Sequence, residues 1–279
     1  MIIVAMGARA LIDRLKARQP NVKALGQHYL HDEDVISSSI EMAELSPDDR
    51  VIEVGPGPGV LTERLLEMSN VVAIEIDEGA CDHLRMVFPE LELIEGDALQ
   101  VKWPQANKVV ANIPYQISSP LIDVITRQPS INHVVILLQE EFAERLVIET
   151  PADRGSLGMC VALDWDCEMG PRVAPHCFIP APQVHSRLVC MKRIDSKENS
   201  RLTKLLIRQG FEQRRKKLRN TLSRAPRRLN RISGWHTSMY KEAFQSIDSE
   251  LLELRPEDLK LTDWLTLSKE LQDYASAMG

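Results

Sequence analysis

The tetrad Asn112-Ile113-Pro114-Tyr115 has residue types that could activate the amino group of a nucleobase. The amino nitrogen of adenine is a weak nucleophile because its lone pair is delocalised into the ring. The Asn112 side-chain oxygen and the Ile113 carbonyl could accept hydrogen bonds from that amino group and favour a more tetrahedral nitrogen. Pro114 fixes φ so that both oxygens converge, and Tyr115 offers a face for a flipped-out base, worth roughly 1–3 kcal/mol. An Asx-type turn that closes a strand is the purely structural alternative.

A glycine-rich turn at residues 55–59 lies upstream of that tetrad and could hold a second ligand. Gly55, Gly57 and Gly59 have no side chains, so the backbone there can approach a ligand closely. The spacing is G-x-G-x-G, whereas the dinucleotide fingerprint G-x-G-x-x-G would require a glycine at Val60. The pattern therefore disfavours a nicotinamide-dependent oxidoreductase. A tight turn between a strand and a helix is the structural alternative.

Two acidic residues follow the glycine turn, each at the end of a predicted strand. Glu75 lies 20 residues after Gly55 and could accept hydrogen bonds from ribose hydroxyls. Asp97 follows the next strand and could accept from an adenine amino group. Both acids suit any adenosine-containing cofactor, and it is the tetrad that favours S-adenosylmethionine over a nicotinamide. Methyl transfer requires the amine in line with the sulfonium methyl group, so we expect positioning to supply much of the catalysis.

The elements that must position these residues alternate between strands and helices. The predicted strands are residues 50–54, 71–76, 91–95, 108–111 and 133–139, and the predicted helices are residues 8–19, 35–45, 60–69, a helix ending at 88, 118–127 and 140–149. This alternation predicts an α/β fold, a Rossmann-like doubly wound and mostly parallel sheet with helices on both faces. Ligands of such sheets bind outside the carboxyl ends of the strands, where the turn, the acids and the tetrad would meet.

The last strands and the C-terminal region are predicted to differ from this pattern. Residues 157–167 and 184–194 are strand candidates separated by a proline-rich loop at 171–182, and we expect an antiparallel hairpin. A polar break at residues 195–200 marks the predicted domain boundary. Residues 1–195 would form a methyltransferase domain with an N-terminal lid segment, and residues 196–279 a small all-helical domain that contacts RNA.

Charge is distributed unevenly along the chain, although its net value is only −6. Residues 201–231 contain 12 basic residues and one acid, whereas residues 241–279 contain 4 basic and 9 acidic residues. A concentrated basic segment on an acidic body predicts a localised contact with a polyanion, and a solvated helix face is the alternative. The candidate RNA-binding residues in this segment are Arg214, Arg215, Lys216, Lys217 and Arg219.

The cysteine and histidine patterns exclude several classes of protein. The five cysteines are odd in number and form no C-x-x-C pair, which argues against a disulfide framework and a zinc ribbon and favours a reducing, cytoplasmic setting. The histidines lack metal-ligand spacing, so we expect no metal site. No apolar run reaches the length needed to span a membrane, and nothing in the sequence indicates an obligate oligomer, so we expect a monomer.

Taken in chain order, the motifs resemble the ribosomal RNA small-subunit adenine N6-dimethyltransferase family, the kasugamycin-sensitivity methyltransferases of bacteria and their archaeal-type relatives. The matching segments are Leu25-Gly26-Gln27-His28-Tyr29-Leu30, Glu53-Val54-Gly55-Pro56-Gly57, Glu75-Ile76-Asp77, Gly96-Asp97-Ala98, Asn112 to Pro120, Gln139-Glu140-Glu141, Arg154-Gly155-Ser156-Leu157 and Phe178 to Val184. The basic segment 211–220 also resembles its counterpart in the small helical domain of the family.

The resemblance implies roles for residues of both ligand sites. The methyl donor would be S-adenosylmethionine, closed over by the N-terminal segment, and Phe178 would pack near the target base opposite Tyr115. The residues implied to bind the donor are Gln27, His28, Leu30, Gly55, Gly57, Glu75, Asp97, Ala98 and Asn112, and those implied in catalysis are Asn112, Ile113, Pro114, Tyr115 and Phe178. His28 and Tyr29 depart from the commonest family residues, Asn and Phe, although a histidine can still donate and accept hydrogen bonds.

The implied reaction adds two methyl groups to each of two adjacent adenosines near the 3′ end of small-subunit rRNA during ribosome biogenesis. The implied partner is the rRNA of a pre-30S-type particle. Two other readings stay open from the sequence. One is a dimethylase of large-subunit rRNA, which would share the fold, the donor and the tetrad. The other is a non-catalytic assembly factor that docks on the immature small subunit.

Overall fold

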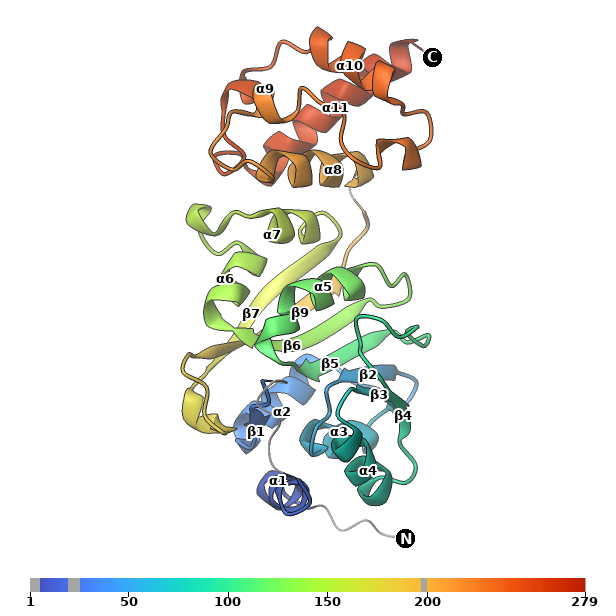
Figure 1. The fold of residues 1–279 in the computed structure, drawn as a ribbon, viewed down its shortest axis with the longest axis vertical. Coiled ribbons are helices and arrows are strands. Elements are labelled where there is room, and N and C mark those ends of the chain that lie inside the picture. The colour runs from blue at the N-terminus through green and yellow to red at the C-terminus, as the bar shows by residue number, and fades with distance from the viewer. Residues whose placement is uncertain (1–5, 20–25, 197–199, 279) are drawn as a thin grey trace. The chain divides into compact units, whose positions relative to one another are not determined.

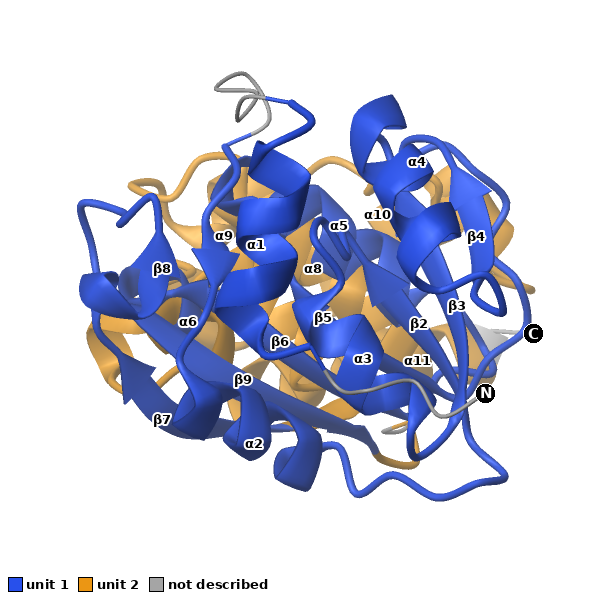
Figure 2. Cartoon of the chain, turned by 90° about the horizontal axis from the view of Figure 1, so that it is seen from below, with its two compact units in different colours: residues 1–143, 167–193 blue, residues 144–166, 194–279 orange. Residues whose placement is uncertain are grey.

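The computed structural model describes residues 6–19, 26–196 and 200–278. Leu25, which begins one of the family-like motifs, and residues 197–199 of the predicted polar break lie outside the described residues. The chain groups into two compact units, residues 1–143 with 167–193 and residues 144–166 with 194–279 (Figure 2). The domain boundary after residue 195 stays a prediction, and the grouping adds that residues 144–166 cluster with the C-terminal helices.

Unit 1 is built around a seven-stranded sheet (Figure 1). The strands, in order across the sheet, are β4 (Glu92–Glu95), β3 (Asn70–Glu75), β2 (Arg50–Val54), β5 (Lys108–Asn112), β6 (His133–Gln139), β9 (Ser186–Arg193) and β7 (Trp165–Val173). The strands from β4 to β6 are parallel to one another, and β9 runs antiparallel to β6. The predicted fold class, a mostly parallel Rossmann-like sheet, is confirmed. The strands predicted at 50–54 and 133–139 have the predicted bounds.

The order of the strands creates a crevice between β2 and β5. From β2 the chain passes through α3 (Val60–Leu66) to β3 and through α4 (Glu78–Val87) to β4, then returns to β5 beside β2 and continues through α5 (Ser118–Thr126) to β6. Because parallel crossovers are right-handed, the reversal of direction puts α5 on the opposite face from α3 and α4. The carboxyl ends of β2 and β5 diverge at such a reversal, where α/β sheets bind their ligands.

Two N-terminal helices complete the α3 side of the sheet. Helix α1 (Ala8–Lys16) and helix α2 (Glu33–Met42) share one apolar core with α3, α4 and the strands. Leu11, Ile12 and Leu15 are fully buried there, and burial of each such side chain contributes about 1.5–3 kcal/mol. An acidic residue caps α2, because the Asp32 side chain accepts from the Val35 N–H at 3.2 Å.

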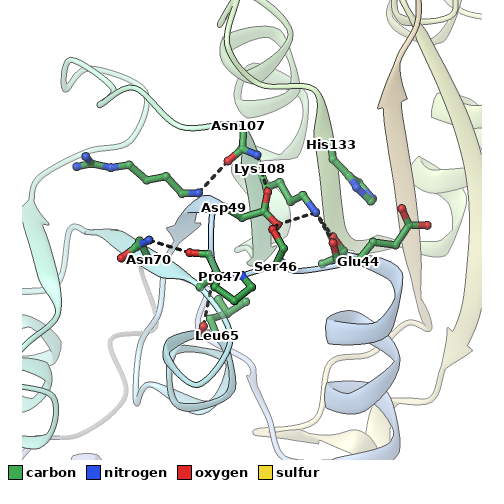
Figure 3. A network of polar contacts seen from close by, with 12 residues as sticks. Glu44, Ser46, Pro47, Asp49, Leu65, Asn70, Asn107, Lys108 and His133 are labelled. Atoms are coloured by element: carbon green, nitrogen blue, oxygen red, sulfur yellow. Dashed lines mark hydrogen bonds and ion pairs between the residues drawn. The ribbon is translucent and has the colours of Figure 1, made fainter.

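At the amino ends of the parallel strands, here called the amino edge of the sheet, a buried lysine at the start of β5 binds the segment that follows α2 (Figure 3). Lys108 Nζ donates to the carbonyls of Ala43 at 2.9 Å and Glu44 at 2.5 Å, and pairs with Asp49 Oδ2 at 3.1 Å. Asp49 Oδ1 in turn accepts from the Asn107 side chain at 2.6 Å. Burial raises the pKa of Asp49, but hydrogen bonds from Asn107, Lys108 and a neighbouring serine outweigh it and bring the pKa to about 2. Every charge in this network therefore has a partner.

One predicted strand is wrong. Residues 156–161 form helix α7 (Ser156–Val161), and strand β7 begins only at Trp165. The apolar run in this region fits a buried helix as well as a buried strand, so periodicity could not separate them. Gly158 allows α7 to pack closely on the preceding segment, because a Cβ there would lie 2.4 Å from the Arg145 carbonyl. Helix α7 packs against the C-terminal helices, which supply its apolar partners.

The predicted proline-rich loop is also shorter and more structured than expected. Strand β7 continues through Pro171 to Val173, which is possible because β7 lies at the edge of the sheet, where a missing N–H costs little. The remaining loop contains the short strand β8 (Phe178–Ile179), which pairs antiparallel with β1 (Tyr29–Leu30). Strand β8 therefore anchors the N-terminal segment 26–30 to unit 1.

Unit 2 is helical apart from the first two residues of β7, within the part of the chain that the structure describes. Its helices are the end of α6 (Glu140–Val147), α7, α8 (Ser200–Phe211), α9 (Leu218–Thr221), α10 (Thr237–Ser246) and α11 (Leu261–Met278). Trp264 and Tyr240 are fully buried in its core, and the Tyr240 hydroxyl donates to the Leu222 carbonyl at 2.8 Å. Among the described residues, no helix combines the length and apolar character needed to cross a membrane.

Candidate functional site

A cavity of about 230 Å³ opens at the carboxyl ends of β2, β3, β4 and β5. Eleven of the residues predicted from the sequence line it: Gln27, His28, Leu30, Gly55, Gly57, Glu75, Asp97, Ala98, Asn112, Ile113 and Pro114. Tyr115 and Phe178 are not among its lining residues. The strand ends and the N-terminal segment, which are far apart in the sequence, thus meet around one ligand-sized space.

The glycine turn after β2 forms one wall of the cavity, and its conformation requires glycine. Gly55, Gly57 and Gly59 all have positive φ angles, of +69°, +53° and +88°. A Cβ on Gly57 would lie 2.9 Å from Cε1 of Tyr29, so the tyrosine ring packs directly on the backbone of the turn. A Cβ on Gly55 would meet nothing closer than 3.9 Å. Gly57 is therefore needed for packing as well as for its backbone conformation.

The Glu75 carboxylate at the end of β3 is buried and already partly occupied. Its Oε1 accepts from the N–H groups of Ile76 at 2.8 Å and Asp77 at 2.9 Å, and its Oε2 accepts from the Gly57 N–H at 3.0 Å. A carboxylate offers about four acceptor positions, so one remains on Oε2. Burial raises the pKa of Glu75, and these backbone hydrogen bonds oppose that shift. The residue both braces the glycine turn and keeps one acceptor for a ligand.

A second carboxyl group, that of Glu53, lines the cavity beneath the glycine turn. Glu53 is 1% exposed, and its Oε2 accepts from the Thr62 hydroxyl at 2.6 Å. Burial raises the pKa of Glu53 to about 8 against the hydrogen bonds from Thr62, and the nearby Glu75 adds to the rise. Glu53 is therefore largely protonated at neutral pH, so the floor of the cavity carries less negative charge than its acids suggest.

Asp77 connects the N-terminal segment to the cavity, a role the sequence analysis did not assign. Its carboxylate accepts from the Gln27 side chain at 2.7 Å and from the Gln19 side chain at 3.1 Å. It also caps α4 by accepting from the Gly79 N–H at 3.1 Å. The acid at position 77 follows Glu75 closely in the family-like motif, and that was the one available signal. Which glutamines would reach it could not be read from the sequence.

The Asn112 side chain has a defined orientation. Its Nδ2 donates to the His28 carbonyl at 3.1 Å. The amide oxygen Oδ1 has no hydrogen-bond partner among the described residues. Strand β5 ends at Asn112, and Pro114 follows with a φ of −58°, which turns the chain into a short 3₁₀ segment beginning at Tyr115. Asn112, which lines the cavity, thus has an amide oxygen without a partner among the described residues, and its role in the tetrad stays a prediction.

Tyr115 is fixed from two sides. Its hydroxyl and the Ser186 hydroxyl are 2.6 Å apart, and Ser186 is fully buried on β9. Its ring stacks on the His28 ring, with 5.8 Å between centroids and 25° between planes. Burial raises the pKa of the Tyr115 phenol, so the hydroxyl stays protonated at neutral pH. One face of the tyrosine ring is therefore covered by His28.

Phe178 lies apart from the cavity in this structure. The side chain is 3% exposed and belongs to the apolar core of unit 1. Its strand β8 pairs Phe178 with Leu30, so the residue supports the N-terminal segment from behind. Its assignment beside a target base stays a prediction.

The remaining wall contains one predicted acid and one residue that sequence reasoning missed. Asp97 accepts from the Leu99 N–H at 2.9 Å and from the Gln100 side chain at 3.0 Å, which fixes the turn after β4. Ile76 lines the cavity and is 53% exposed, which is unusual for a large apolar side chain. An isoleucine between two acids at a strand end was the signal that could have indicated an apolar surface for a ligand ring.

In unit 2 the predicted RNA-binding residues form a turn between α8 and α9 and continue into α9. Three of them pair with acids: Arg214 with Glu257, and Lys217 and Arg219 with Glu253 at 2.9 and 2.8 Å. The side chains of Arg215 and Lys216 are exposed and form no ion pair with a described residue. The sequence charge count therefore overstated the free positive charge of this turn.

The described residues contain no group of three or more His, Cys, Asp or Glu side chains arranged to hold a metal ion. The polar groups around the cavity are instead hydrogen-bond acceptors and donors. Such a site suits an organic ligand with ring, hydroxyl and amino groups.

Comparison with known proteins gives one family. The family model described as "Ribosomal RNA adenine dimethylase" matches residues 19–258. The chain is 36% identical over 280 residues to "Ribosomal RNA small subunit methyltransferase A" of Synechococcus elongatus, covering 91% of this chain and 96% of that protein.

Two solved structures extend the comparison to three dimensions. A dimethyladenosine transferase from Plasmodium falciparum superposes with a TM-score of 0.70 and 28% identity, covering 88% of this chain and 98% of that one. The 23S rRNA methyltransferase ErmE superposes with a TM-score of 0.62 and 26% identity, covering 87% and 99%. The similarity thus spans nearly the whole of each chain.

Proposed function

The chain belongs to the ribosomal RNA adenine dimethylase family, and from that premise we propose that it transfers methyl groups from S-adenosylmethionine to the N6 nitrogens of two adjacent adenosines near the 3′ end of small-subunit rRNA. The observation in the site that carries the proposal is the orientation of Asn112. Its amide nitrogen is engaged by His28, and its oxygen is left free at the wall of the cavity. An amino group is the ligand such an acceptor would bind.

The cavity fits the methyl donor on several counts. The free acceptor position on Glu75 suits a ribose hydroxyl, Asp97 suits an adenine amino group, and the exposed Ile76 offers an apolar surface for the adenine ring. The glycine turn lets the backbone approach closely. When bound, S-adenosylmethionine supplies an electrophilic methyl group on its sulfonium. Gln27 and Tyr29 close the cavity from the N-terminal segment and limit access of water.

At the acceptor, the protein orients and activates the amine. The Asn112 oxygen and the Ile113 carbonyl accept its two hydrogens, which favours a tetrahedral nitrogen with an available lone pair. A monomethylated nitrogen has one hydrogen left, so in the second transfer one of these two oxygens must tolerate a methyl group. Because His28 covers one face of Tyr115, the opposite face is the one available for the target base. Phe178 is buried and supports the N-terminal segment through its pairing with Leu30, and its place opposite Tyr115 near the target base stays a prediction.

The basic turn of unit 2 is proposed to contact the rRNA backbone. Arg215 and Lys216 are available for phosphates as they stand. Arg214, Lys217 and Arg219 form exposed ion pairs, which solvent screens and which can therefore exchange a carboxylate for a phosphate at little cost. We further propose that the enzyme is a cytoplasmic monomer that acts on a pre-30S-type particle.

The test is transfer of labelled methyl from S-adenosylmethionine to purified, unmethylated small and large ribosomal subunits, followed by nucleoside analysis. N6,N6-dimethyladenosine in small-subunit RNA alone is the expected result. Label in large-subunit RNA would instead support the second candidate, which the similarity to ErmE favours. No label in either, with retained binding to the small subunit, would support a non-catalytic assembly factor.

A further inference from the structure

Helix α1 and the turn that follows it, residues 17–19, carry cationic side chains that have no ion pair with any residue in the described parts of the chain. Arg9, Arg14 and Arg18 are exposed, and Lys16 is partly exposed. The guanidinium groups of Arg14 and Arg18 instead contact methionine sulfur atoms, at 3.7 and 2.9 Å. Sulfur is a weak acceptor that neutralises no charge. These four side chains differ in this respect from the basic turn of unit 2, where three of five are paired.

The cations border the buried stripe of the helix on both sides. Arg14 lies on one flank, and Arg18 follows it by four residues in the turn just after the helix. Arg9 and Lys16 are seven residues apart and share the other. Asp13 is the one acid within α1. Since the apolar stripe between the flanks packs into the core, both pairs of cations are directed toward solvent.

Two acids at the N-terminal end of α1 are engaged by other groups. Glu63 accepts from the Met6 N–H at 2.5 Å, and Glu33 accepts from the Ala8 N–H at 3.4 Å. Glu33 also pairs with Arg64 of α3 at 3.4 Å. Glu63 and Glu33 are therefore used to hold the N-terminal end of α1, and Asp13 is the one acid on the helix itself against three basic residues. A positive surface remains on a chain whose net charge is −6.

This surface lies beside the donor cavity. Helix α1 packs with α3, which follows the glycine turn (Figure 2). Gln19, just beyond the end of α1, donates to Asp77, and the same carboxylate accepts from Gln27 in the cavity wall. A polyanion bound along α1 would thus be close to the donor cavity.

We propose that α1 and the turn after it form an RNA-contacting surface of unit 1, at which Arg9, Arg14, Lys16 and Arg18 bind backbone phosphates of the substrate rRNA. The inference rests on the proposed function, because it takes small-subunit rRNA as the polyanion. Unpaired cations suit this partner, since phosphate contacts release condensed counterions and need no carboxylate to be displaced first. The contact is independent of base sequence and positions the strand relative to the cavity.

The experiment measures binding of the full-length protein to purified, unmethylated small subunits over a series of KCl concentrations. The variants are Arg14→Gln with Arg18→Gln, and Arg9→Gln with Lys16→Gln, in which the apolar stems are retained. The matched control is Arg50→Gln with Arg127→Gln, two exposed cations of unit 1 that are already paired, with Glu92 and Asp123, and that lie at the amino edge of the sheet. Arg215→Gln with Lys216→Gln serves as the reference for the basic turn.

We expect each α1 pair to weaken binding about tenfold and to reduce the slope of log affinity against log salt by about one to two, with S-adenosylmethionine affinity unchanged. The control should retain the wild-type slope. Wild-type affinity and slope in both α1 variants would overturn the inference while leaving the methyl-transfer assay, and hence the proposed function, untouched. An equal loss in the control would also overturn it, because the effect would then be one of net charge alone. If the wild type methylates only large subunits, the proposed function fails, and the same variants decide the inference on that RNA.

Discussion

Buried polar residues lie at both ends of the parallel strands in unit 1, at the amino edge, where the strands begin, and at the carboxyl edge, where they end. The two sets of residues have different roles. At the amino edge, Lys108 has three oxygen partners and Asp49 has partners on both oxygens (Figure 3). At the carboxyl edge, Asn112 keeps a free amide oxygen and Glu75 keeps one acceptor position. Polar groups that satisfy one another stabilise the fold, whereas groups left open are available to a ligand. The amino ends of the strands therefore contribute to stability, whereas the carboxyl ends offer polar groups to a ligand.

Two buried carboxyl groups sharpen this contrast. Asp49 has a pKa of about 2 because its hydrogen bonds, including those from Lys108 and Asn107, outweigh burial. Glu53 has a pKa of about 8 because burial outweighs its hydrogen bonds from Thr62. The difference comes from two causes: Asp49 has a cation and several other donors as partners, whereas Glu53 has only Thr62 among the described residues and is more deeply buried.

The largest expected effect is on stability at the amino edge. Lys108→Met should lower the free energy of unfolding by about 3–5 kcal/mol, because it leaves a buried carboxylate and two carbonyls without their cation. Urea denaturation measures the change, and methyl transfer per folded molecule should be unaffected. Arg50→Ala, which breaks an exposed pair at the same edge, should cost no more than about 1 kcal/mol. If Lys108→Met lowered the free energy of unfolding by less than Arg50→Ala does, the network around Lys108 would not be the structural element proposed here.

The next effect concerns the pH dependence of stability. The folded-state pKa of Glu53, about 8, lies above its ordinary value of 4.5, so folding favours the protonated form. Its contribution is complete below pH 4.5 and is lost as the pH rises toward 8. Glu53→Gln should therefore become more stable relative to the wild type across this window, by on the order of 3 kcal/mol at pH 8. Thermal unfolding is measured for both proteins at a series of pH values. A difference in stability that stays constant from pH 4.5 to 8 would contradict the expectation.

At the carboxyl edge, Asn112→Ala should slow methyl transfer about a hundredfold, because one of the two acceptors for the amine is lost. The free energy of unfolding and the affinity for the small subunit should be nearly unchanged. Single-turnover transfer of labelled methyl, with binding measured in parallel, checks both parts. Wild-type turnover at equal affinity would show that the free oxygen of Asn112 serves no catalytic purpose.

The smallest expected effect isolates the close approach at the glycine turn. Gly57→Ala should weaken binding of S-adenosylmethionine about tenfold more than Gly55→Ala. Both substitutions strain a positive φ, but only the new Cβ at 57 would lie 2.9 Å from Tyr29. Titration calorimetry measures both affinities. Equal losses would mean that backbone strain, and not the packing of Tyr29, explains the need for glycine.

The sequence predictions were accurate where the signal lay within a short stretch of the chain, and they failed where it depended on contacts between distant segments. The strands at 50–54 and 133–139 were correct to the residue, since continuous apolar runs bounded by polar residues mark buried parallel strands. The helix at 156–161 was missed because its apolar run has no distinguishing period, and its partners in α8 are distant in the sequence. Lys108 was not identified as a structural residue, because its three partners come from the end of α2 and the following loop.

By itself, the sequence determined which chemical groups are present and in what order: the glycine turn, the acids at successive strand ends, the tetrad and the basic segments. Alternating strands and helices then dictated that the first three meet at one edge of a sheet. Only the tertiary structure decided which of these groups remain open to a ligand. Gln27 binds Asp77, Tyr115 binds Ser186, and Arg214 pairs with Glu257, each across a long stretch of chain. Such pairings depend on packing between distant segments, which local residue patterns do not encode.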